Sequence, residues 1–115
     1  MPEREGCHLI LDGETEQPLT VTKVERFLRH YPRFIGMQRI TEPVVIVQRG
    51  GCCGIVIIAE SHVSIHSRER KVMVDVFSCV GLDVSAATKG LVRLLGLVEY
   101  DVRAIPRPMP APAIR

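Results

Sequence analysis

The sequence predicts an α+β fold, a two-layer sandwich in which a mostly antiparallel sheet carries two helices on one face. Three observations lead to this prediction. The chain has 115 residues, 46% of them hydrophobic, which is enough for one domain with its own core. Several segments alternate apolar and polar residues, as half-buried strands do. Two further segments have apolar residues at helical spacing, and the approximate order β-α-β-β-β-α-β is typical of such a sandwich.

The chain begins with a predicted strand and a predicted helix. The strand covers residues 7–11 and is expected to end at the Asp-Gly pair that follows, a dipeptide typical of turns. Thr22 and Glu25 have the spacing of a capping box, so a helix is expected to begin there. Apolar residues then recur at helical spacing until Pro32, which stops the helix.

Most of the predicted sheet lies in the middle of the chain. Residues 37–48 are rich in β-branched side chains and predict a strand with an irregularity at Pro43. Residues 54–59 form the most apolar strand, and residues 61–66 are expected to continue it with strict alternation. The polar side chains of that alternation share one face: His62, Ser64 and His66. After a charged turn, residues 72–79 predict another alternating strand.

The last third of the chain predicts a helix, a strand and a tail. Asp83 or Ser85 is expected to cap the helix, and Gly96 stands where a helix end favours a positive φ. Residues 97–105 predict the last strand. Residues 106–115 contain four prolines and are expected to form a flexible tail outside the single domain.

Composition argues against several classes of function. The net charge of +2 comes without a dense run of basic residues, so no nucleic-acid partner is expected. No apolar run approaches the ~20 residues that a membrane-spanning helix needs, so no membrane association is expected. The charged N-terminus is not followed by the apolar segment of a secretory signal, so the protein is expected to be cytoplasmic.

The four cysteines are expected to be free thiols, since disulfides are rare in cytoplasmic proteins. They are Cys7, Cys52, Cys53 and Cys79. Their spacing is not that of a structural zinc site, so no metal is expected. A less favoured alternative is a metal site that combines two cysteines with two histidines: Cys53, His62, His66 and Cys79.

The segment most informative about chemistry is residues 59–66, AESHVSIH, which places serines and histidines directly after an apolar strand. A serine beside a histidine suggests a hydrolase. That interpretation is weak, because the Gly-x-Ser-x-Gly pattern is absent and no residue is evidently placed to orient the base.

The same segment closely resembles the processing site of the prokaryotic S-adenosylmethionine decarboxylases, small pyruvoyl-dependent enzymes of polyamine biosynthesis. Three other segments are similar to that family. Residues 6–12 resemble its first strand, residues 53–58 resemble the glycine and apolar run before its cleavage site, and residues 75–79 resemble its Asp-hydrophobic-Phe-small-Cys strand. The resemblance is strongest over residues 53–79.

The resemblance implies that the chain cuts itself between Glu60 and Ser61, leaving residues 1–60 and 61–115 associated. Ser61 would become a pyruvoyl group, a covalent cofactor that forms a Schiff base with the substrate amine and acts as an electron sink. His66 would transfer a proton during processing, and Cys79 would be the general acid in decarboxylation. The strand pattern allows Ser61, His66 and Cys79 to meet.

Two of the positions at which the sequence departs from the family bear on function. Cys53 stands where the family usually has a serine that assists processing, and a thiol is the weaker hydrogen-bonding group. Arg68 stands where the family has a tryptophan that lies on the adenine of the substrate. Arginine can also stack on a base, so Arg68 is a candidate substrate-binding residue.

Three functional hypotheses follow. The first is a self-processing S-adenosylmethionine decarboxylase of polyamine and spermidine biosynthesis. The second keeps the pyruvoyl chemistry with L-arginine or L-ornithine as the amino-acid substrate. The third is an uncut, non-catalytic paralogue. The resemblance also implies a homodimer of cut protomers, with residues from both near each site.

Overall fold

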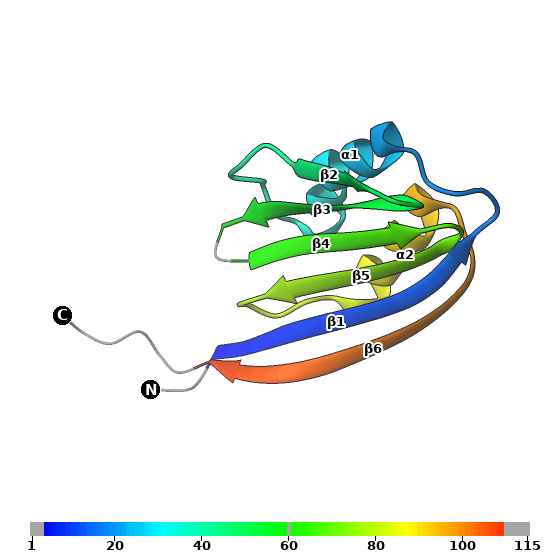
Figure 1. Ribbon diagram of the computed structural model, residues 1–115. Coiled ribbons are helices and arrows are strands. Elements are labelled where there is room, and N and C mark those ends of the chain that lie inside the picture. Colours follow the sequence, from blue (N-terminus) through cyan, green and yellow to red (C-terminus); the bar gives the residue numbers. More distant parts are fainter. Residues whose placement is uncertain (1–3, 60, 110–115) are drawn as a thin grey trace.

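A six-stranded sheet forms one layer of the molecule, and two helices lie against one of its faces (Figure 1). The computed structural model describes residues 4–59 and 61–109. In chain order the elements are β1 (Arg4–Thr15), α1 (Val21–His30), the 3-10 helix η1 (Tyr31–Ile35), β2 (Val44–Gln48), β3 (Gly51–Ile58), β4 (Ser61–Arg68), β5 (Lys71–Ser78), α2 (Val84–Leu95) and β6 (Leu97–Met109). The strands lie in the order β2-β3-β4-β5-β1-β6, and all neighbours are antiparallel. The predicted α+β fold is confirmed.

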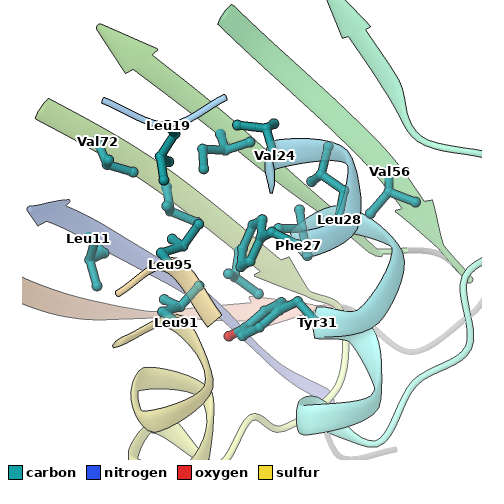
Figure 2. Close-up of a cluster of buried hydrophobic side chains, with 14 of the residues drawn as sticks. Leu11, Leu19, Val24, Phe27, Leu28, Tyr31, Val56, Val72, Leu91 and Leu95 are labelled. Carbon is teal, nitrogen blue, oxygen red and sulfur yellow. The ribbon is translucent and has the colours of Figure 1, made fainter. Parts of the chain in front are cut away.

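The core lies between the sheet and the helices. Alternate residues of the central strands are buried, as the period of two along a strand requires. Figure 2 shows the side chains from α1, η1 and α2 that meet this face: Val24, Phe27, Leu28, Tyr31, Leu91 and Leu95. The hydroxyl of the buried Tyr31 donates a hydrogen bond to the Ala87 carbonyl at 2.9 Å and so joins η1 to α2.

The opposite face of the sheet, here called the open face, has no helix against it in the described chain. Large apolar side chains on it are exposed: Val44, Ile46, Ile55, Ile57, Met73 and Ile105. An extended exposed apolar surface of this kind is typical of an interaction surface rather than of a face in water.

Residues 54–66 were expected to be one continuous strand, and this prediction is wrong. They form two antiparallel strands, β3 and β4, in which Ile58 pairs with Ser61. The chain reverses at Ala59, whose φ of 53° is incompatible with an extended strand. The alternation predicted for residues 61–66 is confirmed in β4.

The first strand is longer than expected, because Gly13 does not end it. Gly13 pairs with Val72 on one side and Tyr100 on the other. A Cβ atom at Gly13 would lie 2.9 Å from the Glu99 carbonyl oxygen, so the glycine allows β6 to approach closely. The Asp-Gly pair therefore serves strand packing and is no turn.

The helix ends were predicted with mixed success. The first helix is capped by Thr20, whose hydroxyl accepts a hydrogen bond from Lys23 N, so the expected start at Thr22 is wrong. Asp83 caps α2 by accepting a hydrogen bond from Ala86 N, and Gly96 ends it at a φ of 68°, both as predicted.

Two other segments differ from expectation. Of residues 37–48, only Val44–Gln48 form a strand. The last strand continues past residue 105 to Met109, because β6 is an edge strand and proline is tolerated where no neighbour needs its missing N–H. Residues 106–109 therefore pair with β1 rather than forming a flexible tail, while residues 110–115 lie outside the described residues. No helix of the described ranges is long and apolar enough to cross a membrane.

Candidate active site

Ser61 and Cys79 lie together at one end of the sheet. Ser61 is the first residue of β4, and Cys79 directly follows β5, the antiparallel neighbour of β4. The Ser61 Oγ accepts a hydrogen bond from the backbone N–H of Cys79 at 3.1 Å, and the Ser61 hydroxyl donates to Cys79 Sγ at 3.7 Å. Their exposed fractions are 2% and 7%, so bulk water has little access to this pair. Glu60, the other partner in the predicted cleavage, lies outside the described residues.

His66 and Cys53 form a second pair, which lies on the open face. They are directly opposite each other on β4 and β3. Both line a hollow of about 300 Å³ together with apolar and polar side chains of the neighbouring strands: Ile46, Ser64, Met73 and Asp75. The arrangement places the predicted processing helper beside the predicted proton-transfer residue.

The two pairs are far apart within one chain. His66 is the fifth residue after Ser61, and a strand rises ~3.3 Å per residue, so their Cα atoms lie about 16 Å apart. An odd number of residues along a strand also places the two side chains on opposite faces, as the alternating burial of β4 shows. The structure thus brings Ser61 to Cys79 and leaves His66 away from both.

The remaining predicted site residues lie elsewhere. Arg68 is exposed and ends β4 opposite Lys71, at the far end of the strand from Ser61. His62 packs on Phe77 on the open face, with ring centroids 5.7 Å apart. Within the described ranges, no group of three or more His, Cys, Asp and Glu side chains is placed to hold a metal ion. The four-residue metal alternative is therefore not assembled.

Sequence reasoning missed one pair near the hollow. The His8 Nε2 atom lies 2.9 Å from Asp75 Oδ1, on the open face between β1 and β5. Asp75 also lies directly opposite Ser64 and lines the hollow. The alternation of residues 72–79 indicated that Asp75 shares a face with Met73 and Phe77, but the pairing of β1 with β5 was needed to find His8.

All four cysteines are free, as predicted. Burial raises the pKa of the Cys52 thiol, and the neighbouring Cys53 adds to the rise. Burial likewise raises the pKa of Cys7, with a further contribution from Glu5. Both thiols are therefore protonated near neutral pH, and neither is activated as a nucleophile.

Comparison with known proteins decides the family. A family model described as S-adenosylmethionine decarboxylase matches residues 8–108. The chain belongs to this family. S-adenosylmethionine decarboxylases use a pyruvoyl cofactor and act on a small-molecule substrate. The match includes β3 and β4, which carry Cys53, Ser61 and His66, and it also includes Cys79, which follows β5.

Among solved structures, the chain is similar to the crystal structure of the adenosylmethionine decarboxylase from Aquifex aeolicus VF5. The TM-score is 0.77, the sequence identity is 21%, and the match covers 98% of each chain. At this identity the comparison shows a shared fold over the whole S-adenosylmethionine decarboxylase domain. A search of curated proteins gave no match.

Proposed function

We propose that this chain is a self-processing proenzyme that cuts itself between Glu60 and Ser61 and then decarboxylates S-adenosylmethionine. The observation that carries the proposal is the contact of Ser61 with Cys79, because it joins the predicted cofactor precursor to the predicted general acid. Family membership supports the same chemistry. Because the pair is buried, little water can compete with the Ser61 hydroxyl for the Glu60 carbonyl.

Processing would begin at the Ser61 hydroxyl. Its oxygen attacks the Glu60 carbonyl carbon, the C–N bond of the Glu60–Ser61 peptide breaks, and the freed amine takes the hydroxyl proton. A base then removes the proton on the Cα of residue 61, the Cβ–O bond breaks, and Glu60 leaves as a carboxylate. The enamine left at residue 61 takes a proton at Cβ and loses one from nitrogen, which gives an imine. Water then hydrolyses the imine to the carbonyl of the pyruvoyl group and releases ammonia.

The residues around Ser61 fit a pyruvoyl group at this position. The Oγ atom that Cys79 contacts leaves with Glu60 during processing, so the Cβ atom of residue 61, which would be the methyl carbon of a pyruvoyl group, would lie beside Cys79. When formed, the group would supply the electron sink for the charge that decarboxylation leaves on the substrate α-carbon. Cys79 would then return a proton to that carbon, since its thiol is the acid nearest to residue 61 among the predicted site residues.

His66 poses a geometric problem that a homodimer would solve. Within one chain it lies about 16 Å from Ser61 along β4. A second copy packed on the open face, with its strands reversed, would bring its own His66 toward the end of the sheet that carries Ser61. The proton to be removed is on the Cα of residue 61, in the backbone of β4, and not on the Ser61 side chain that faces the helices, so the base need not come from the helix-covered face. The exposed apolar side chains of that face support the same packing.

Intact mass spectrometry of the purified protein tests the cleavage. We expect two fragments that meet between residues 60 and 61, the second of them carrying the mass change of pyruvoyl formation. Ser61→Ala should give one whole chain. A single uncut wild-type chain would exclude the enzyme and leave the non-catalytic paralogue, and normal cleavage of Ser61→Ala would show that the site is wrong.

Co-expression of two inactive chains tests the role of His66 across subunits. Differently tagged His66→Ala and Ser61→Ala chains should each stay whole when expressed alone. Expressed together, the His66→Ala chain should be cut, because it keeps Ser61 and receives His66 from its partner. The Ser61→Ala chain should remain whole in the same mixture. If neither chain is cut in the mixture, the arrangement across subunits is wrong, while wild-type cleavage would still support the cleavage site.

The substrate is the less constrained part of the proposal. Arg68 replaces the aromatic residue that the family uses against adenine, which favours keeping L-arginine and L-ornithine as second candidates. Release of CO2 from the three amino acids, measured in parallel on cut protein, distinguishes them. We expect S-adenosylmethionine to give the highest kcat/KM, and a preference for either other substrate would replace the first proposal.

A further inference from the structure

The turn before the proposed cleavage site has an unusual backbone conformation. Ile58 pairs with Ser61, so the loop between β3 and β4 has two residues, of which Ala59 is the first. Ala59 has a φ of 53°. For an L-residue with a Cβ atom, the left-handed region brings Cβ close to the following carbonyl oxygen. The strained residue is separated from the scissile bond by Glu60 alone.

The residue types in this loop are poorly suited to it. Two-residue hairpin loops need positive φ values and favour glycine, asparagine or aspartate. The loop between β2 and β3 follows the rule, with Gly50 at a φ of 78°. The loop between β4 and β5 does not, since it has Glu69 at a φ of 54°. Ala59 and Glu69 are the non-glycine residues with positive φ in the described chain.

Both ends of the Ala59 loop are held in place. On the β3 side, the backbone N–H of Ile57 donates to Thr41 Oγ1 at 3.2 Å, and the Ile57 carbonyl accepts from Ile40 N at 2.8 Å. On the β4 side, Ser61 is fixed by its hydrogen bonds with Cys79. The strand ends therefore resist the shift that would let Ala59 relax.

We propose that Ala59 is a positioning residue whose left-handed strain accelerates self-cleavage at Glu60–Ser61. The inference rests on the proposed function, because it assumes that this bond is cut. Before the step, the Glu60 carbonyl carbon is joined to the Cα of Ser61 through the backbone nitrogen. After the carbonyl carbon moves to the Ser61 oxygen, it is joined to Cα through Oγ and Cβ, a covalent path that is longer by one bond. The longer path loosens the loop, so Ala59 can leave the left-handed region as the ester forms. Strain present before the step and relieved during it lowers the barrier.

The test compares substitutions that relieve strain at the two matched loops. Ala59→Gly should slow cleavage roughly 5- to 30-fold, the change in rate expected from ~1–2 kcal/mol of left-handed strain. Ala59→Asn should cleave at an intermediate rate, because asparagine tolerates the left-handed region better than alanine. Glu69→Gly relieves the same conformation at the other hairpin, and it should leave the rate unchanged. The rate is followed as loss of whole chain on a gel after a pulse of labelled amino acid in cell-free translation.

The outcomes separate this inference from the function on which it rests. If the wild-type chain is never cut, the proposed function fails. If the wild-type chain is cut and Ala59→Gly is cut at least as fast, the role of strain is refuted while the function stands. Equal slowing by Ala59→Gly and Glu69→Gly would also refute it, because the effect would then be a general one of added glycine. Slowing confined to position 59 and graded from alanine through asparagine to glycine supports it.

Discussion

Ser67 provides a direct test of the packing between β4 and the helices. It is 2% exposed on the helix-covered face, and its Oγ is a buried side-chain oxygen without a hydrogen-bond partner among the described residues. A buried hydroxyl without a partner costs ~1–3 kcal/mol of desolvation. Ser67→Ala removes that cost, but part of the gain in stability is lost because alanine has a low strand propensity. We expect the free energy of unfolding to rise by about 1 kcal/mol and Tm by about 4 °C.

Ser78 is the matched control for this prediction. It is fully buried on the same face of the neighbouring strand, but its hydroxyl donates to the Val80 carbonyl at 2.7 Å. Ser78→Ala should therefore lower the free energy of unfolding by about 1–2 kcal/mol. Both substitutions are made in a Ser61→Ala background, so that one uncut chain unfolds, and are measured by thermal and guanidinium unfolding. Equal destabilisation by the two substitutions would refute the reasoning.

Three further predictions follow from the structure. Cys79→Ala should still be cut, because the backbone N–H that holds Ser61 Oγ remains, but CO2 release should fall at least ~100-fold as a general acid is lost. Unchanged turnover would remove that role. Cys53→Ser restores the stronger hydrogen-bonding group beside His66 and should leave less uncut chain on a gel, whereas an unchanged fraction would argue against a helper at this position. Burial raises the pKa of Tyr31, so the folded chain keeps a proton that the unfolded chain loses above pH ~10, and stability falls as pH rises beyond that value. Above that pH, the free energy of unfolding of Tyr31→Phe should fall by up to ~1.4 kcal/mol per pH unit less than that of the wild type. If the free energies of the two proteins fall equally with pH, the raised pKa is contradicted.

Much of the fold follows from local patterns in the sequence. The alternation in residues 61–66 and 72–79 correctly gave the buried and open faces of β4 and β5, because a period of two directly reflects which side chains meet the core. The errors occurred where a local signal had a tertiary cause. Gly13 was interpreted as part of a turn, but its role is to let β6 approach. The reversal at Ala59 lacks the glycine or asparagine that normally marks a hairpin, so nothing local indicated it.

The candidate site depended on strand register, which the sequence did not specify. The loop between β4 and β5 has two residues, so Arg68 pairs with Lys71 and the start of β4 reaches the residues that follow β5. That register alone brings Ser61 to Cys79. The same count applied to β3 and β4 pairs Cys53 with His66. A two-residue interpretation of both turns would have given both pairs, and the strand period would have shown that they lie on opposite faces.

The position of Arg68 bears on how substrate choice could change while processing is kept. Arg68 ends the strand that Ser61 begins, which places their Cα atoms about 23 Å apart at ~3.3 Å per residue. Within one chain, the loop after β4 therefore lies far from residue 61, where the proposed substrate would be held. In the proposed homodimer, the reversed strands of a second copy would carry this loop over the Ser61 end. The contact between Ser61 and Cys79 lies within one subunit, whereas the loop would act on its partner, so we expect a substitution at position 68 to alter substrate choice without disturbing the hydrogen bonds between Ser61 and Cys79.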